Sequence, residues 1–174
     1  MEALRKFTHG LSWALVALGS GMVGLMALHV SVEVLSRFLL NLPLPGTVEI
    51  VARYYMVAVI FLPLAYGQMM RAHFQADLLE RFLSDGFWRV MGGLSDLVIV
   101  LLAAAFAWRT GLAALDATEV GEHVQTAVYT LPTWPSRWLP PIGFAALSLI
   151  SLAQLVARFA ATEEQVEHVR DTGL

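Results

Sequence analysis

Four charged residues near the first outer turn of the chain have types and spacing suited to pairing. Glu33 and Arg37 are four residues apart, as are Glu49 and Arg53. On a helix this spacing puts both side chains on one face, and an acid preceding its base is the favourable order. If the chain reverses near Pro43, Arg37 faces Glu49 and Glu33 faces Arg53. We expect a salt-bridge clamp between two helices, with a direct role in binding solute or ion as the alternative.

Asp96 is the only charged residue within the apolar segment Val90–Trp108. It follows Trp88 by eight residues, which is about 12 Å of helix. A carboxylate inside a membrane must be protonated, paired or close to water. The sequence places no cation, amide or second acid clearly at its depth. We therefore expect Asp96 to make a helix-packing or subunit contact, with a proton or sodium site as the alternative.

Five histidines raise the question of haem. A haem held by two histidines needs two imidazoles at similar depth on facing helices. Only His29 lies well inside an apolar segment, and His73 falls at the opposite membrane surface. A polar contact is the favoured role for His29. A haem-binding anchor subunit of a respiratory redox complex remains the alternative function, but we expect no cofactor, metal or catalytic site.

The composition indicates a membrane protein. Hydrophobic residues make up 57% of the 174, charged residues 14%, and the mean hydropathy is +0.65. Soluble domains have about 45–50% apolar and about 25% charged residues. The net charge of −3 and the scattered basic residues argue against a nucleic-acid surface. Without cysteine, the chain can form no disulfide and no cysteine-ligated metal site.

Four apolar segments are long enough to cross a bilayer as helices, since about 20 residues span its ~30 Å hydrocarbon core. The expected fold is an all-α integral membrane protein. It has one domain over residues 1–160 and a polar cytoplasmic tail over 161–174. The four spans cover about residues 11–33, 50–72, 88–109 and 138–158.

The positions of the basic residues predict the orientation. If both termini are cytoplasmic, the inner segments carry seven Lys and Arg residues and the outer loops three. Inner loops are enriched in these residues, so this orientation in the bacterial inner membrane is favoured. The inner residues are Arg5, Lys6, Arg71, Arg81, Arg89, Arg158 and Arg170, and the outer ones are Arg37, Arg109 and Arg137.

The connecting segments differ in character. Asn41–Gly46 contains helix breakers and predicts a short outer turn. Apolar residues at helical spacing in Phe74–Phe87 predict an amphipathic helix on the inner membrane surface. Thr110–Arg137 is the longest outer loop, and Pro140 and Pro141 suit the first turn of span four.

Small residues predict where helices approach closely. Ala17, Gly21 and Gly24 share one face of the first span, and such faces let another helix come near. Pro63 in the middle of the second span predicts a kink, because proline cannot donate the helical hydrogen bond. We interpret both features as structural.

Several short patterns, in order along about residues 10–160, resemble the small membrane subunit, DctQ type, of tripartite ATP-independent periplasmic (TRAP) transporters. The chain departs from the resemblance at Phe74-Gln75-Ala76, where the family more often has Ile and Val. The matching patterns are Arg37 after span one, Pro45-Gly46-Thr47-Val48-Glu49, Arg71-x-His73-Phe74-x-x-Asp77, Leu131-Pro132-x-Trp134 and Pro141-Ile142-Gly143.

The resemblance implies a role that the residues alone do not. Such transporters import organic acids and similar solutes, generally with a sodium gradient. The small subunit would bind a large multi-span permease stably and a periplasmic solute-binding protein transiently, with no catalytic site of its own. The pattern also implies a corner in which Asp77 caps the surface helix and His73 holds the turn, a solvated helix end being the alternative. A self-sufficient small transporter is the third function considered, after the respiratory anchor subunit.

Overall fold

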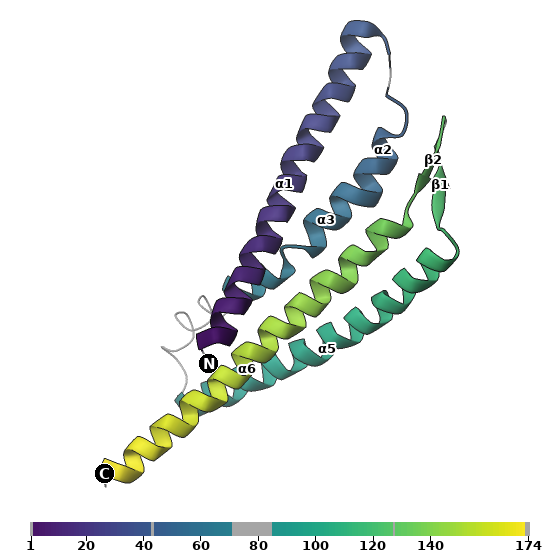
Figure 1. Ribbon diagram of the computed structural model, residues 1–174. Helices are drawn as coiled ribbons and strands as arrows, with labels where there is room; N and C mark the ends of the chain where they lie inside the picture. The colour runs from purple at the N-terminus through teal and green to yellow at the C-terminus, as the bar shows by residue number, and fades with distance from the viewer. Residues whose placement is uncertain (1, 43, 71–84, 127, 173–174) are drawn as a thin grey trace.

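The computed structural model describes residues 2–42, 44–70, 85–126 and 128–172. Four helices in these segments are long and apolar enough to cross a membrane, which confirms the expected all-α membrane fold. They form two helical hairpins, as Figure 1 shows. The spans are Lys6–Leu40, Thr47–Met70, Met91–Glu119 and Trp134–Phe159.

The first hairpin joins α1 (Glu2–Leu40) to a second span that is not a uniform helix. This second span begins as α2 (Thr47–Ile50), widens into the π-helix η1 (Val51–Tyr55) and continues as α3 (Met56–Phe61). After a break at residues 62–63, residues 64–70 are helical again. The inserted π-turn changes the direction of the side chains that follow it, and two tyrosines described below lie within it.

The turn between α1 and α2 depends on two residues with positive φ. Asn41 has a φ of 55° and Gly46 a φ of 87°. Asparagine and glycine tolerate this left-handed conformation better than other residues. The Ser36 hydroxyl donates to the carbonyl of Leu42 at 2.8 Å and so closes the end of α1.

The second hairpin consists of α5 (Asp85–Glu119) and α6 (Leu139–Thr172). Between them lie the short antiparallel strands β1 (His123–Gln125) and β2 (Thr130–Pro132) and the 3₁₀ helix η2 (Trp134–Trp138). Two differences from expectation stand out. The helix continues through residues 110–119, which were expected to be loop, and the remaining loop forms a small β-hairpin. The alanine- and leucine-rich sequence Gly111-Leu-Ala-Ala-Leu115 favours the continued helix.

Two expectations about the inner segments have different outcomes. Most of the predicted surface helix, with Arg71, His73 and Asp77, lies outside the described residues, and residues 85–87 belong to α5. Residues 161–172 of the predicted polar tail continue α6 as a helix that projects past the bundle (Figure 1).

α6 is the central helix, because it packs against α5 along the second hairpin and against α1 and α3 of the first. The core between the hairpins is small and consists of apolar residues from three spans. Many large apolar side chains elsewhere are exposed, as expected for helices that face lipid or other membrane helices. The core residues are Leu15, Ala58, Leu62, Ala65, Ala146 and Ile150.

The break at Pro63 fits between two glycines on neighbouring helices. A Cβ atom added to Gly143 on α6 would lie 2.3 Å from the carbonyl oxygen of Phe61. A Cβ added to Gly19 on α1 would lie 3.0 Å from Cγ of Pro63. The kinked span therefore packs closely against both helices. A side chain at Gly143 would prevent the close contact with α6.

We predict that Gly143→Ala destabilises the bundle by about 2–3 kcal/mol, because the new methyl group would overlap backbone atoms that cannot rotate away. Gly19→Ala should cost less, since its neighbour is the edge of a proline ring. Gly24→Ala is the matched control, because a Cβ there meets no atom within 4 Å. Unfolding of the purified chain in mixed micelles measures the order of the three effects, and equal stability of the Gly143 and Gly24 variants would contradict the prediction.

Candidate functional site

The charged residues of the first hairpin do not form the clamp that their spacing predicted. Glu33 is buried and pairs with Arg37 within α1, where Arg37 is largely exposed. Of the four residues, all within the described segments, no ion pair joins Arg37 to Glu49 or Glu33 to Arg53. The i,i+4 pairing on one helix is present, and the pairing across the hairpin is not.

The cross-hairpin prediction is wrong because the two helices are not in register about Pro43. Gly19 lies against Pro63, and His29 lies beside Tyr55. Both pairs are displaced from mirror symmetry about residue 43 by at least two positions. A shift of one residue in the register changes the direction of a helical side chain by about 100° around the helix axis. Figure 1 shows α1 projecting beyond the start of α2, so the turn descends between them.

The charge of Arg53 instead acts on Glu122, in the loop between α5 and α6. Glu122 accepts two hydrogen bonds from Arg137, at 2.9 and 2.7 Å. The hydrogen bond from Arg137 holds the pKa of the Glu122 carboxyl below its usual range, and the charges of Arg137 and Arg53 lower it further. The carbonyl of Glu122 also accepts the backbone N–H groups of Thr133 and Trp134, at 2.8 and 3.2 Å. Glu122 therefore closes the base of the β-hairpin.

Two tyrosine hydroxyls connect the β-hairpin to the first helical hairpin. Tyr54 on η1 donates to the carbonyl of Pro132 on β2. Tyr129, next to β2, donates to the carbonyl of Pro45 at 3.3 Å. The same hydroxyl occupies the space beside Gly46, where an added Cβ would lie 2.1 Å from it. These contacts hold the β-hairpin against the turn of the first hairpin.

The neighbouring Tyr55 points to the other side of η1. Its hydroxyl lies 3.4 Å from Nδ1 of His29 on α1, and the two rings meet edge to face. Consecutive side chains on a helix point about 100° apart, so the two tyrosines reach two different elements, β2 and α1. His29 thus has the polar contact that its position predicted.

Asp96 pairs with Arg158, a contact that the sequence interpretation missed. Nε and Nη2 of Arg158 lie 3.2 and 3.1 Å from Oδ2 of Asp96, whose side chain is 11% exposed. The guanidinium lies where a Cβ on Gly92 would be, at 2.4 Å. The expectation that no cation matches the depth of Asp96 is therefore wrong. Mirror positions about the second outer loop would have identified this pair.

A second polar contact joins the second span to α6 near the same end. Nε2 of Gln68 donates to Oε1 of Gln154 at 3.3 Å, and Gln154 donates to the carbonyl of Gln68 at 3.4 Å. Ser148 donates to the carbonyl of Val100 on α5 at 3.3 Å. α6 is thus connected by polar contacts to both of its neighbours, which supports association in lipid, where apolar burial contributes little.

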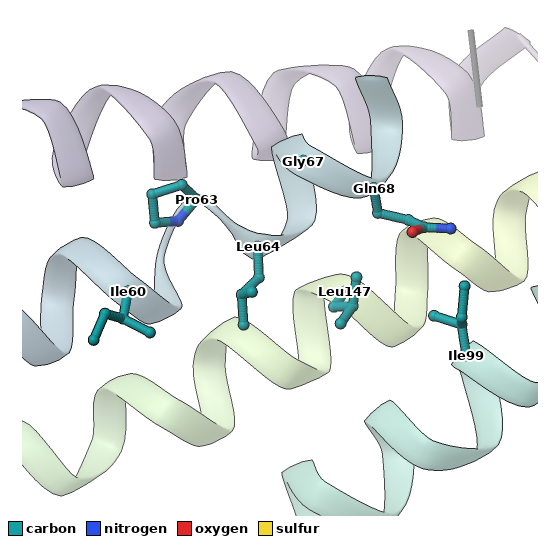
Figure 2. Close-up of a pocket in the computed structure, with 7 residues that line it drawn as sticks. All are labelled: Ile60, Pro63, Leu64, Gly67, Gln68, Ile99 and Leu147. Carbon is teal, nitrogen blue, oxygen red and sulfur yellow. The ribbon is translucent and has the colours of Figure 1, made fainter. Parts of the chain in front are cut away.

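An apolar cavity of about 370 Å³ lies between the second span, α5 and α6. Figure 2 shows the Gln68 side chain as its polar member, with apolar side chains around the rest. We call this cavity the groove. Its lining residues are Ile60, Pro63, Leu64, Gly67, Gln68, Ile99 and Leu147.

Trp134 begins η2, the residue is 37% exposed, and its backbone N–H donates to the carbonyl of Glu122. Within the described segments, no three His, Asp or Glu side chains lie close enough together to hold a metal ion. The polar residues that the structure brings together connect helices and loops of the chain itself. Fold and contacts together define a small multi-pass helical membrane protein.

Comparison with known families gives the particular class. Residues 26–161 match the family described as "Tripartite ATP-independent periplasmic transporters, DctQ component". Because the match covers most of the chain, from the second half of the first span to the end of the fourth, the protein belongs to this family of TRAP transporter small permease components. The family implies a complex with a large permease and a binding protein. No curated protein and no solved structure matches the chain.

We predict that the Glu122–Arg137 contact stabilises the loop between α5 and α6 at neutral pH, and that this stabilisation is lost at strongly acidic pH. The folded-state pKa of Glu122 lies below its unfolded value of about 4.3. The contribution is therefore complete above that value and is lost as pH falls through the lower folded pKa. Exposed pairs contribute up to about 1 kcal/mol. Thermal unfolding at pH 7 and pH 3 should show a smaller acid effect in Glu122→Gln than in the wild type. An identical acid effect would exclude this contribution.

We also predict that Arg158→Met destabilises the protein strongly, by about 3 kcal/mol, because it leaves the buried Asp96 carboxylate unpaired. The double variant Asp96→Asn/Arg158→Gln should recover part of the loss, since neither side chain is then charged. Unfolding in mixed micelles provides the comparison, and a double variant less stable than Arg158→Met would contradict it.

Proposed function

We propose that this chain is the non-catalytic small permease subunit of a sodium-driven TRAP importer of organic acids or similar solutes, and that it supports the large transport subunit as a static scaffold. The match to the DctQ family carries the proposal. The contacts within the chain agree with a static role. The packing of the kink at Pro63, the Asp96–Arg158 ion pair and the Gln68–Gln154 contacts all fix the helices relative to one another.

The apolar lining of the groove beside the break in the second span also supports an accessory role. Transporter sites lie near the bilayer midplane, between broken helices that point polar groups at the substrate. Here the break at Pro63 is packed against Gly19 and Gly143, and the groove beside it is apolar. Solute and sodium would then be bound by the partner subunits.

The proposed arrangement places the chain in the bacterial inner membrane with both termini in the cytoplasm, as the basic residues indicate. The large permease would bind stably to exposed helix faces, and α1 offers the best candidate. A Cβ at Gly21 or Gly24 meets no atom within 4 Å, so this small-residue face is open to another helix. The outer loops, joined through Tyr54 and Tyr129, would touch the solute-binding protein transiently.

Reconstitution into liposomes tests the proposal. With a large permease, a binding protein, solute and an inward sodium gradient, we expect uptake only when this chain is present. The chain alone should give none. Collapse of the sodium gradient should abolish uptake by the full set. Uptake by this chain alone, or undiminished uptake by the large permease without it, would rule out the accessory role.

The α1 face can be tested in the same system. Gly24→Leu should reduce recovery of the complex, because the larger side chain keeps a partner helix away. Ala113→Leu on α5 is the control, since it places the same side chain at another exposed position. Equal recovery of both variants would exclude the α1 face as the contact.

A further inference from the structure

The groove is open along the side of the bundle and lies at the depth of the membrane. It runs along the second span from Ile60 to Gln68, on both sides of the break at residues 62–63. Ile60 is 55% exposed, and a Cβ on Gly67 would meet no atom within 4 Å. An apolar ligand can therefore enter from the lipid without passing through the bundle.

One face of α6 continues from the groove toward the end that carries Arg158. Leu147, Gln154 and Arg158 are spaced at i, i+7 and i+11, which places them on one face of a helix. Along this face the chemistry changes from an aliphatic side chain to an amide and then to a guanidinium, over about 16 Å. The side chain of Arg158 is 35% exposed.

This order is that of a phospholipid in a bilayer, with its acyl chain deepest, its ester carbonyls next and its phosphate at the surface. Amide N–H groups suit ester carbonyls, and guanidinium groups suit phosphate. The basic residues of the chain place this end of α6 at the inner surface. The groove thus has the polarity of an inner-leaflet lipid.

The lining favours an acyl chain over a helix of another protein. A helix is about 10–12 Å wide with its side chains and approaches closely where the facing residues are small. The groove is lined by branched side chains, Ile60, Leu64, Ile99 and Leu147, and has room for a narrow flexible chain. The open small-residue face of α1 is the better surface for a helix.

We propose that the groove is a binding site for one membrane glycerophospholipid of the inner leaflet. One acyl chain lies between Ile60 and Leu147, the ester region meets the Gln68–Gln154 amides, and the phosphate lies at Arg158. This proposal does not depend on the transport role, because it concerns only surfaces of this chain.

The test uses the full chain purified in mild detergent and native mass spectrometry. We expect one phospholipid to remain bound to the wild type after partial delipidation. Gly67→Leu places a side chain in the groove and should lose that lipid, and Ile60→Trp should do the same at an exposed position. Gly24→Leu adds the same bulk on α1 and should keep the lipid. Circular dichroism confirms that each variant is folded.

The headgroup contact is tested by adding lipids back to the delipidated chain. Phosphatidylglycerol should bind about tenfold more tightly than diacylglycerol with the same chains, the ratio that one charge-assisted contact supplies. The neutral double variant Asp96→Asn/Arg158→Gln should lose that preference and still bind the acyl chain.

Three results would overturn the proposal. The first is equal lipid retention by the Gly67 and Gly24 variants. The second is equal affinity of the wild type for phosphatidylglycerol and diacylglycerol. The third is loss of the lipid when the large permease binds, because a partner helix would then be the occupant of the groove.

Discussion

The close packing of a kinked second span between two glycines is the constraint on which the bundle depends. Pro63 has no backbone N–H group, so the helix cannot continue through it unchanged. The kink turns the carbonyl of Phe61 toward Gly143 and the proline ring toward Gly19. Because Gly143 lies on α6, this contact fixes the first hairpin to the second. The core from Leu15 to Ile150 is small, and close backbone packing compensates for its size.

Polar contacts then fix the two ends of the bundle. At one end Arg158 and Gln154 hold α5 and the second span to α6. At the other end two tyrosine hydroxyls and the Glu122–Arg137 pair hold the β-hairpin to the first turn. Each contact joins two groups of this same chain. Such an arrangement resists relative movement of the helices, which agrees with the proposed scaffold role in a TRAP transporter.

The sequence predicted the spans and the kink but not the register between helices. Hydropathy and proline act locally, so spans and kink can be inferred from composition along the chain. Pairing across a hairpin depends on the shape of the turn, and the Asn41–Gly46 turn displaces the partners of Glu33 and Arg37. The π-helix at Val51–Tyr55 has no sequence signal strong enough to predict it. The Asp96–Arg158 pair could have been predicted from the sequence. The two residues are about equally far in sequence from the middle of the loop between α5 and α6, which places them near each other.

α1 shows why hydropathy could not separate contacts within the chain from contacts with a partner. Gly19 faces the kinked span, whereas Gly21 and Gly24 face open space. The step from Gly19 to Gly21 is two residues, about 200° around the helix. One helix therefore has two opposite faces of small residues, and only the three-dimensional packing tells which face the bundle already uses. The face left open lies on a span that packs with its other side against the kinked span and α6. A membrane helix so placed gains most from a partner that packs against its outer side.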